Sequence, residues 1–533
     1  MSRCSKMRWL WLALILMVAF LLRVPGVFWG KLYENQFVIL EPDEYQHVHL
    51  AINFLQNVDP ALFTGFRNVA TNSLGFSTQI ALFGYPLIKV FGEDYRSLFF
   101  IGRGLSVFYG LLLVWLVYRL ADLIFEDKGP ALFAAASMAG FDLAVTYSHY
   151  AVPEIPYVFW AYLSVFCCLL LFQKTENNYV AGQVPLTSRT GVIWLCMTLS
   201  MGMTLGMKYD FLPGVFFASL VAYQVVQRRI SALNAVLLGT ISALAVLLFF
   251  SLSIGFQSGW SGNVKTLRWL ADANNDIAKD NHYLYNPALY FVGVAVGVGL
   301  PATLLSFSAA WKMRKRPVNG EEERARQMLL VLAFFQLLEF LVLWNLGTPF
   351  VRRGLIFLPF VAVLVGNATF HLIQLQKPVR KAGVIFLGLY TLALTGVSQW
   401  NFVKDNRFEA RDFVLQPQFA GKEIFHDFYT NIPSMPPNPE RSQADTILMH
   451  ESYYSRFWKS FTTPFKMPKC CEEVYHCPSK EECLFYQNIL AGASDFHLVK
   501  TFEPLDWAPE RLLYKRLFGT YETFLGDVLI FEK

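Results

Sequence analysis

Two adjacent carboxylates, Asp43 and Glu44, follow the first long apolar run of the chain, and His47 comes one helical turn later. A carboxylate at a membrane face is suited to general base chemistry, in which it takes a proton from a reacting hydroxyl group. The structural alternative is a helix start, because Pro42 at a helix entry and an acid in the first turn are common N-terminal features. The acid pair is therefore a candidate reaction centre, with a capping role as its rival.

A surface helix is the element expected to carry these acids. From Asp43 onward, apolar side chains recur at helical spacing, which suits a helix lying flat on a membrane surface. This apolar stripe consists of Tyr45, Val48, Ile52 and Leu55. Asp43 and His47 share the opposite face, together with Leu50 and Phe54. We therefore expect a helix wedged between lipid and protein.

Further charged groups are expected at the same membrane face. They are Arg103, His149, Glu154, Lys208, Arg352 and Arg353. Acids and cations together suit an anionic lipid-linked substrate, because its phosphate binds cations while a hydroxyl acceptor requires a base. The alternative for Lys208, Arg352 and Arg353 is interfacial anchoring at a helix end. Arg103 lies in an apolar context, where an unpaired charge is costly.

The composition requires a membrane protein. Of the 533 residues, 54% are hydrophobic and only 16% are charged, with a mean hydropathy of +0.37. A chain of this composition cannot close as a water-soluble globule. The first apolar segment is interpreted as a retained helix, since no small-residue cleavage pattern follows it.

A hydropathy window of about 19 residues predicts roughly eleven transmembrane helices. They lie near residues 9–24, 96–118, 130–148, 156–172, 191–207, 211–227, 232–256, 286–310, 328–346, 353–374 and 383–400. Clusters of Lys and Arg fall in every second connection, which places the N-terminus in the cytoplasm. The loop 24–95 and the C-terminus are then expected outside. These clusters account for the net charge of +5, which consequently does not indicate nucleic-acid binding.

Two domains are expected. A mainly α-helical membrane domain covers residues 1–400, and a small extracytoplasmic α/β domain covers residues 401–533. Apolar strand-like runs support the second domain, at residues 446–449, 496–499 and 528–531.

Four cysteines lie in this second domain, at Cys470, Cys471, Cys477 and Cys483. An oxidising compartment favours two disulfides among them. A bond between the adjacent Cys470 and Cys471 is strained, so each is expected to pair with Cys477 or Cys483. A zinc site that includes His476 is the alternative, although the spacing lacks a Cys-x-x-Cys pair.

Several short motifs, taken in order, resemble the GT-C glycosyltransferases of the protein O-mannosyltransferase type, a group that includes the lipid A aminoarabinose transferases. They are Asp43-Glu44, Gly102-Arg103-Gly104-Leu105-Ser106, Ser148-His149-Tyr150-Ala151-Val152-Pro153-Glu154, Gly206-Met207-Lys208-Tyr209, and the spacing from Arg353 to Pro359. The resemblance covers roughly residues 8–400. It departs at residues 71–79, where Thr-Asn-Ser-Leu-Gly-Phe-Ser-Thr-Gln replaces a His-Pro-Pro stretch. The resemblance therefore does not identify the sugar or the acceptor of this protein.

The resemblance implies an integral-membrane inverting glycosyltransferase. It would move a single sugar from an undecaprenyl or dolichyl phosphate to an extracytoplasmic protein, lipid or glycan acceptor. The membrane would be a bacterial plasma membrane or the endoplasmic reticulum membrane. One rival is an oligosaccharide polymerase or ligase, and another is a lipid-linked sugar transporter or flippase. Transporters place ionisable groups near the bilayer midplane and repeat their halves, and neither feature is evident in the sequence.

The resemblance also implies roles for the acids. Asp43 would be the base, with Glu44 as second candidate, because a single inverting displacement needs one base and no covalent intermediate. Glu154 would be a further acid that holds the acceptor or a divalent ion. No cofactor is expected with certainty, and the absence of a compact Asp-x-Asp motif leaves a divalent metal ion open.

The cations and histidines receive roles from the same resemblance. The candidates for the donor phosphate are Arg103, Lys208, Arg352 and Arg353, and a bidentate arginine suits a phosphate better than lysine does. His47 and His149 are candidate metal or substrate contacts, with a hydrogen-bonded structural role as the alternative. Asp142 and Glu339, predicted inside helices, either pair with cations, contact the donor or pack as hydrogen-bonded groups.

Overall fold

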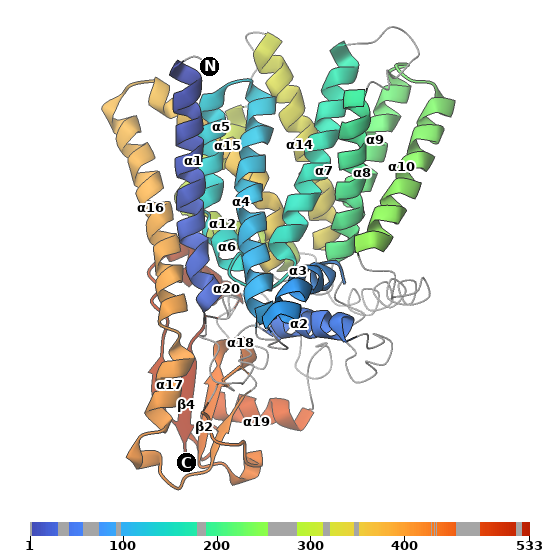
Figure 1. The fold of residues 1–533 in the computed structure, drawn as a ribbon. Helices are drawn as coiled ribbons and strands as arrows, with labels where there is room; N and C mark the ends of the chain where they lie inside the picture. The colour runs from blue at the N-terminus through green and yellow to red at the C-terminus, as the bar shows by residue number, and fades with distance from the viewer. Residues whose placement is uncertain are drawn as a thin grey trace.

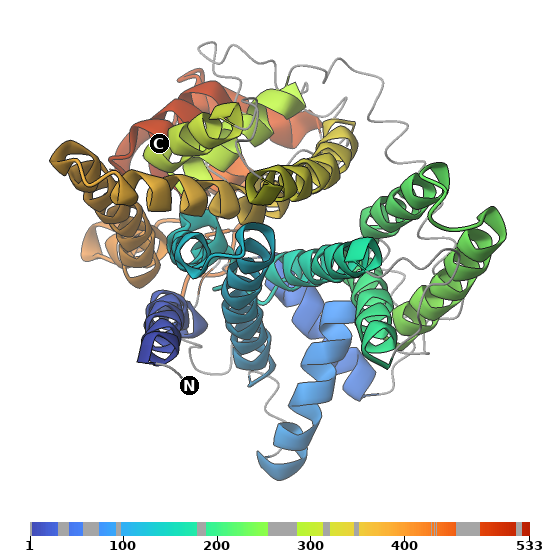
Figure 2. The same cartoon turned by 90° about the horizontal axis from the view of Figure 1, so that it is seen from above.

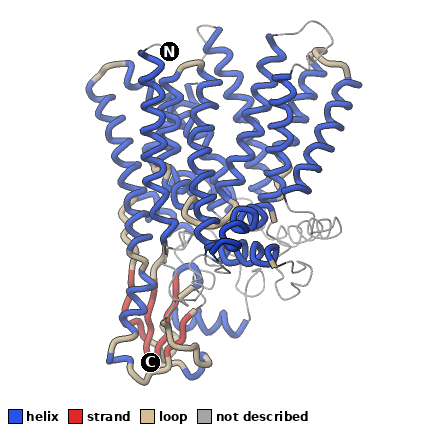
Figure 3. Tube along the Cα trace, viewed as in Figure 1, coloured by secondary structure: helices blue, strands red, loops and turns tan. Residues whose placement is uncertain are grey.

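The computed structural model consists of a helical bundle with a small β-sheet domain at one end (Figure 1). It describes residues 3–29, 42–56, 74–91, 97–177, 188–253, 285–312, 320–345, 351–427, 429–430, 432, 434–454, 480–518 and 525–533. Helices make up the bundle, and the strands are confined to the C-terminal part (Figure 3). This arrangement agrees with the predicted mainly α-helical class.

Each predicted apolar segment forms helix within the described residues. The bundle helices are α1 (Arg3–Arg23), α4 (Ser97–Phe125), α5 (Lys128–Gly140), α6 (Asp142–Tyr147), α7 (Glu154–Asn177), α8 (Ser188–Lys208), α9 (Leu212–Val226), α10 (Ala232–Ser253), α12 (Tyr285–Val298), α13 (Leu300–Lys312), α14 (Gly320–Trp344), α15 (Leu358–Gln374) and α16 (Pro378–Val403). A helix satisfies its backbone hydrogen bonds internally, as a bilayer requires. Eight helices in the described residues are long and apolar enough to cross a membrane, or nine if one bent pair is a single span. The chain is therefore a multi-pass membrane protein.

This count differs from the prediction of about eleven spans because three of the predicted segments form shorter or bent helices. Helices α5 and α9 are only 13 and 15 residues long. Helices α12 and α13 form the bent pair, at an angle of 112°. Gly299 makes the bend with φ of +87°, a conformation that favours glycine. The eleven-span topology and its orientation stay predictions.

The chain ends lie at opposite ends of the bundle (Figure 1). Seen from above, helices α8, α9 and α10 gather at one side, with α1 and α16 at the other (Figure 2). Between these two sides of the bundle, small residues let neighbouring helices approach each other closely, as in other membrane bundles. A Cβ atom on Gly366 of α15 would lie 2.4 Å from the backbone nitrogen of Ala134 on α5.

Two helices between α1 and α4 lie at the end of the bundle nearest the sheet domain (Figure 1). They are α2 (Pro42–Leu55) and α3 (Gly75–Phe91). The predicted helix is present, but Val48 and Ile52 of its apolar stripe pack with Phe76 and Ile80 of α3 and are not available to a membrane surface. Its other face is also covered, because Leu50 packs against Leu74. The sequence analysis did not anticipate α3, which is the element that holds α2 in place.

The C-terminal domain contains a four-stranded sheet in the order β1-β2-β4-β3. The strands are β1 (Ile424–His426), β2 (Thr446–His450), β3 (His497–Phe502) and β4 (Val528–Glu532), and the helices are α17 (Asn406–Val414), α18 (Glu451–Tyr454), α19 (Lys480–Leu490) and α20 (Pro509–Phe518). β1 pairs in parallel with β2, and the other pairs are antiparallel. The three predicted strand-like runs coincide with β2, β3 and β4.

Helix α20 fastens this domain to the bundle. Arg511 Nη2 donates hydrogen bonds to Asp142 Oδ2 on α6 and to Ser398 Oγ on α16, both at 2.6 Å. Glu510 Oε1 accepts one from Leu300 N at 3.2 Å, immediately after the bend at Gly299. Asp142 therefore takes the cation-pairing alternative considered from the sequence, and its partner comes from the C-terminal domain.

The outer cysteines are only partly covered by the described residues. Cys483 is buried on α19 and is disulfide-bonded. Cys470, Cys471 and Cys477, together with His476, lie outside the described residues. The predicted connectivity and its zinc alternative therefore stay predictions.

Candidate active site

A row of alternating charges joins four elements where α2 meets the end of the bundle. Asp43 Oδ2 lies 2.5 Å from Arg352 Nη1. Arg352 Nε lies 3.6 Å from Glu154 Oε1, and this oxygen accepts a hydrogen bond from Lys208 Nζ at 2.6 Å. The structure thus brings together four of the predicted site residues, although Asp43 and Arg352 are 309 positions apart in sequence.

Each of these four side chains comes from the end of a helix. Asp43 and Glu154 lie in the first turns of α2 and α7, and Lys208 is the last residue of α8. Arg352 lies at the start of the 3-10 helix η3 (Val351–Phe357). Acids are favoured at helix N-termini and cations at C-termini, so the dipoles of α2, α7 and α8 support these charges.

The turn after Lys208 has an uncommon backbone conformation. Tyr209 has φ of +52°, in the left-handed region that bulky residues rarely adopt. After it, Asp210 Oδ1 accepts a hydrogen bond at 2.9 Å from the backbone nitrogen of Leu212, the first residue of α9. Strain of this kind costs about 1–3 kcal/mol and gathers at functional sites. The turn places Lys208 and Asp210 beside α7, where the Tyr157 hydroxyl donates to Asp210 Oδ2 at 3.0 Å.

Burial and charge act in opposite directions on Asp43. Burial alone raises the pKa of this carboxyl group, but the nearby Arg352, His47 and Lys208 lower the pKa, and the net pKa is below its ordinary value. His47 is only 1% exposed, and this burial lowers its pKa to about 4. Its Nδ1 lies 3.2 Å from Ser77 Oγ. At neutral pH, Asp43 is therefore ionised and His47 is neutral.

The two ends of the row of charges are more exposed than its middle. The side chains of Lys208 and Asp43 are 32% and 23% exposed, whereas those of Arg352 and Glu154 are 16% and 4% exposed. The second carboxylate oxygen of Glu154, Oε2, is buried and has no hydrogen-bond partner. The site is therefore accessible at Lys208 and Asp43 and buried at Glu154.

Glu44 and Arg103 lie together in a separate, closed pair. Arg103 donates from Nε and Nη2 to the two carboxylate oxygens of Glu44, at 2.8 and 2.9 Å. Glu44 Oε1 also accepts from Ala151 N at 2.7 Å, and Arg103 Nη1 donates to Trp29 O at 2.6 Å. Both side chains are at most 2% exposed. This differs from the predicted roles as second base and phosphate ligand, because each group is occupied by the other, and the geometry favours a structural role for both.

Of the remaining predicted site residues, some lie beside the row of charges and one lies away from it. Arg353 follows Arg352 in η3 and lies within electrostatic reach of Glu154 and Tyr157. His149 is buried away from the row, where its Nε2 lies 3.2 Å from Leu22 O and its ring packs edge-on against Phe402. His149 therefore fits the structural alternative, while His47 and Arg353 adjoin the site.

Metal binding receives no direct support from the described residues. Among them, no group of three or more acidic, histidine or cysteine side chains is placed to hold a metal ion. Glu154 Oε2 is a buried oxygen of the site that has no hydrogen-bond partner. A divalent ion therefore stays a prediction.

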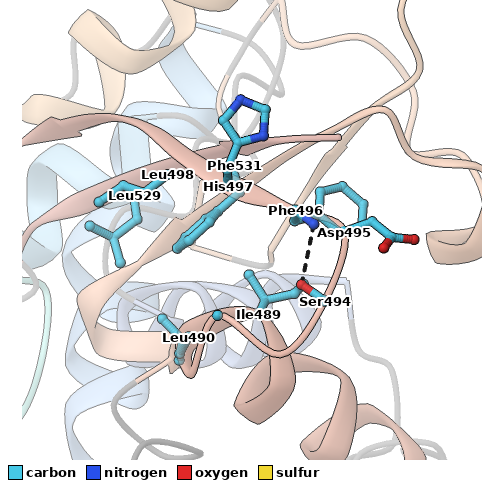
Figure 4. A pocket seen from close by; sticks show the side chains of 10 residues that line it. Ile489, Leu490, Ser494, Asp495, Phe496, His497, Leu498, Leu529 and Phe531 are labelled. Carbon is cyan, nitrogen blue, oxygen red and sulfur yellow. Dashed lines mark hydrogen bonds between the residues drawn. The ribbon is translucent and has the colours of Figure 1, made fainter.

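A shallow groove in the C-terminal domain has a different character. It has a volume of about 590 Å³ and lies between β3, β4 and the end of α19, with Leu498, Leu529 and Phe531 in its lining (Figure 4). The polar contact drawn there is internal, from Phe496 N to Ser494 Oγ at 3.3 Å. The groove lacks the opposed acids and cations of the charged row.

Comparison with known families agrees with the resemblance drawn from the motifs. Residues 77–257 match the model of the family described as dolichyl-phosphate-mannose-protein mannosyltransferase. This segment contains Arg103, Glu154 and Lys208 but ends before Arg352. No curated protein sequence matches the chain.

Solved structures share the fold at low sequence identity. Archaeal oligosaccharyltransferase AglB from Archaeoglobus fulgidus, in complex with an inhibitory peptide and a dolichol-phosphate, is 13% identical with a TM-score of 0.51, and the match covers 100% of this chain and 89% of that one. ArnT from Cupriavidus metallidurans in the apo state is also 13% identical, with a TM-score of 0.50 and coverage of 81% and 84%. For the apo Archaeoglobus fulgidus oligosaccharyltransferase, with 14% identity and a TM-score of 0.48, the match covers 86% of this chain and 62% of that one. The family match over residues 77–257 confirms the predicted GT-C resemblance, and the AglB structure and the apo ArnT structure agree with it in fold.

Proposed function

We propose that this protein is an inverting glycosyltransferase that moves a single sugar from a polyprenyl phosphate to a hydroxyl group of an extracytoplasmic protein, lipid or glycan. The observation that carries the proposal is the row Asp43–Arg352–Glu154–Lys208, in which a base and two cations meet at one accessible place. A sugar on a phosphate already has its leaving group, so the protein needs only to deprotonate the acceptor and stabilise the departing phosphate.

The reaction follows from the position of Arg352 between two acids. Arg352 and Lys208 would bind the phosphate oxygens, and Asp43 would accept the proton of the acceptor hydroxyl. The acceptor oxygen forms a bond to C1 of the sugar as the bond from C1 to the phosphate oxygen breaks, and the bonding electrons leave with the phosphate. One displacement of this kind inverts the configuration at C1.

Donor binding would also activate the base. Burial raises the pKa of Asp43, and the Arg352 guanidinium counteracts this effect and contributes to the low pKa. A phosphate that binds Arg352 neutralises part of this positive charge. The effect of burial on Asp43 then exceeds the effect of the remaining positive charge. The pKa of Asp43 rises, which makes the carboxylate a stronger base. Arg352 would thus couple the presence of the donor to proton removal from the acceptor.

Two kinds of support come from outside the site. The family match over residues 77–257 concerns a sugar donor on a dolichyl phosphate. The AglB structure of similar fold contains a dolichol-phosphate. An oligosaccharide polymerase or ligase, the alternative within the same chemistry, would use a polyprenyl diphosphate or a longer glycan as donor.

The test is a transfer assay with purified protein in detergent. Radiolabelled polyprenyl-phosphate monosaccharides and polyprenyl-diphosphate oligosaccharides would be offered with a panel of protein, lipid and glycan acceptors. We expect transfer from the monophosphates alone, with inversion at C1 in the product. Transfer from the diphosphates alone would replace the proposal by the ligase alternative.

A pair of variants tests whether sugar transfer depends on the charged row. Asp43→Asn should abolish product formation, whereas Asp412→Asn should not, because the Asp412 side chain is 66% exposed on α17. Equal transfer by Asp43→Asn and the wild type would contradict the proposed base. Movement of lipid-linked sugar across liposomes without any transfer product would indicate a transporter.

A further inference from the structure

A second group of polar side chains adjoins Glu154 and takes no part in the reaction proposed above. Tyr157 lies one turn after Glu154 on α7, and its hydroxyl donates to Asp210 Oδ2 at 3.0 Å. Asp210 is also hydrogen-bonded to Glu339, a residue of α14 that is only 2% exposed. Two carboxyl groups can share a hydrogen bond only when one of them carries a proton. The pair therefore holds at most one negative charge.

Two carboxylate oxygens in this region have no hydrogen-bond donor. They are Oε2 of Glu154 and Oε1 of Glu339, and both are buried. A buried polar atom without a partner is unfavourable, because it has lost its hydrogen bonds to water. Glu154 Oε1 is paired with Lys208 and Arg352, but no hydrogen bond in the described residues accounts for Oε2 of Glu154 or for Oε1 of Glu339. A ligand that brings donors to them would remove the cost.

The charges around these acids restrict the ligand. Lys208 and Arg352 face Glu154 Oε1 on the accessible side, which is the side suited to a phosphate. The acids on the buried side repel a phosphate but accept hydrogen bonds from hydroxyl groups. A sugar phosphate has the same order of groups, with an anionic end followed by several hydroxyl donors.

We propose that Glu154, Tyr157, Asp210 and Glu339 form the subsite that binds the hydroxyl groups of the transferred sugar. Glu154 Oε2 and Glu339 Oε1 would accept hydroxyl hydrogen bonds directly. Tyr157 and Asp210 would hold Glu339 in position through their hydrogen bonds. This inference rests on the proposed function, because it assigns the sugar end of the same donor.

The experiment compares two lipids that differ only in the sugar. Binding of undecaprenyl phosphate and of undecaprenyl phosphate bearing a hexose would be measured on the purified full chain in detergent. Glu339→Met keeps the side-chain length on α14 and removes the acceptors. We expect it to weaken binding of the glycosylated lipid about tenfold, which corresponds to the loss of one or two hydrogen bonds. Binding of undecaprenyl phosphate itself should not change.

Two control variants separate the possible outcomes. Glu321→Met changes an exposed acid at the start of the same helix and should leave the affinity for both lipids unchanged. Arg352→Ala should weaken binding of both lipids, because both carry the phosphate. Equal losses for both lipids with Glu339→Met, or no loss for either, would overturn the subsite while leaving the phosphate site intact. A wild-type protein that binds neither lipid would overturn the proposed function and the subsite together.

A repeat of the measurement with a chelator tests the competing ligand. If chelation of divalent ions weakened binding of the glycosylated lipid as much as Glu339→Met does, the acids would hold a cation, and the subsite would be wrong. Unchanged binding with the chelator supports direct contact with the sugar. Thermal unfolding of Glu339→Met gives the check on folding, and we expect a cooperative transition at a moderately lower temperature, because Asp210 loses its hydrogen-bond partner on Glu339.

Discussion

Asp43 and Glu44 are neighbours in sequence, yet they belong to regions of opposite character. Glu44 is buried with Arg103 in a closed pair in which both carboxylate oxygens and three guanidinium nitrogens have partners. Asp43 faces the partly exposed Arg352, whose guanidinium also lies near Glu154. The first region has nothing left to offer a ligand, whereas the second has accessible charges and one unpaired oxygen.

In this protein, charged groups whose hydrogen-bonding atoms are all paired fit a structural role, whereas charged groups with exposed or unpaired atoms are available for chemistry. A buried ion pair contributes to stability mainly when every group in it is satisfied. A catalytic group has to exchange its partner for a substrate during the reaction. The Glu44–Arg103 pair therefore fits a role in holding α2 on α4, and the row from Asp43 to Lys208 fits a role in binding and reaction.

Substitution of Asp43, the carboxylate in the accessible region, should have the greatest effect on activity. Asp43→Asn should lower kcat for sugar transfer about 10²- to 10⁴-fold, the range that a general base contributes. The melting temperature should change little, because the Asp43 side chain is 23% exposed. Transfer kinetics and thermal unfolding in detergent measure the two quantities. A large fall in melting temperature with intact kcat would place Asp43 in the same class as Glu44.

Substitution of Glu44, the carboxylate in the closed pair, should instead reduce stability. Glu44→Gln leaves the Arg103 charge buried without a counter-ion, which costs about 3–5 kcal/mol of unfolding free energy. The double variant Glu44→Met with Arg103→Met should recover much of that loss, since apolar side chains can replace a buried pair. Chemical unfolding in detergent measures both. If the double variant were folded yet inactive, the pair would have a role beyond structure.

A smaller effect sharpens the role of Arg352. Arg352→Lys keeps a positive charge but loses the planar fork that can contact Asp43, Glu154 and a phosphate together. We expect KM for the donor to rise about tenfold with a smaller change in kcat, a difference of about 1.4 kcal/mol. Steady-state kinetics at several donor concentrations measure it. An unchanged KM would indicate that Lys208 or Arg353 binds the phosphate instead.

A further effect concerns the pH dependence of stability and His47. The pKa of His47 falls from 6.5 to about 4 on folding, so between these values the unfolded chain binds more protons than the folded one. Stability should therefore decrease as the pH falls from 6.5 to 4, and His47→Gln should flatten this part of the profile. Thermal unfolding across this range measures the difference. The same slope in His47→Gln and the wild type would contradict a buried neutral imidazole.

Much of the fold could be predicted because apolarity is a local property of the sequence. A run such as 353–374 is long and uncharged enough to require a helix whatever it packs against. Helix α3 was missed because it has only 17 residues and contains Pro86, so it resembles an outer loop. The bend at Gly299 was missed for a related reason, since one glycine in an apolar run does not reveal its φ angle.

The site could be predicted only in part, because charge types are visible in a sequence and charge partners are not. The two arginines Arg103 and Arg352 are equivalent as residue types. What separates them is that Glu44 reaches one and Asp43 the other, over 59 and 309 positions. Asp210 had a signal in its position two residues after Lys208, but its contact with Tyr157 required the left-handed turn at Tyr209.

The docking of α20 has a consequence for the order in which the protein becomes active. Tyr514 on α20 lies against Gly293 of α12, where an added Cβ atom would be 4.0 Å from the Tyr514 ring and 2.6 Å from Val351, the residue before Arg352. Helix α12 therefore contacts both α20 and η3, the element that carries Arg352, and α20 is synthesised after the bundle helices. On the predicted topology, a nascent chain would have every transmembrane helix in place and still lack a finished site. Catalytic competence would then begin only when the C-terminal domain had crossed the membrane and folded beside its acceptors.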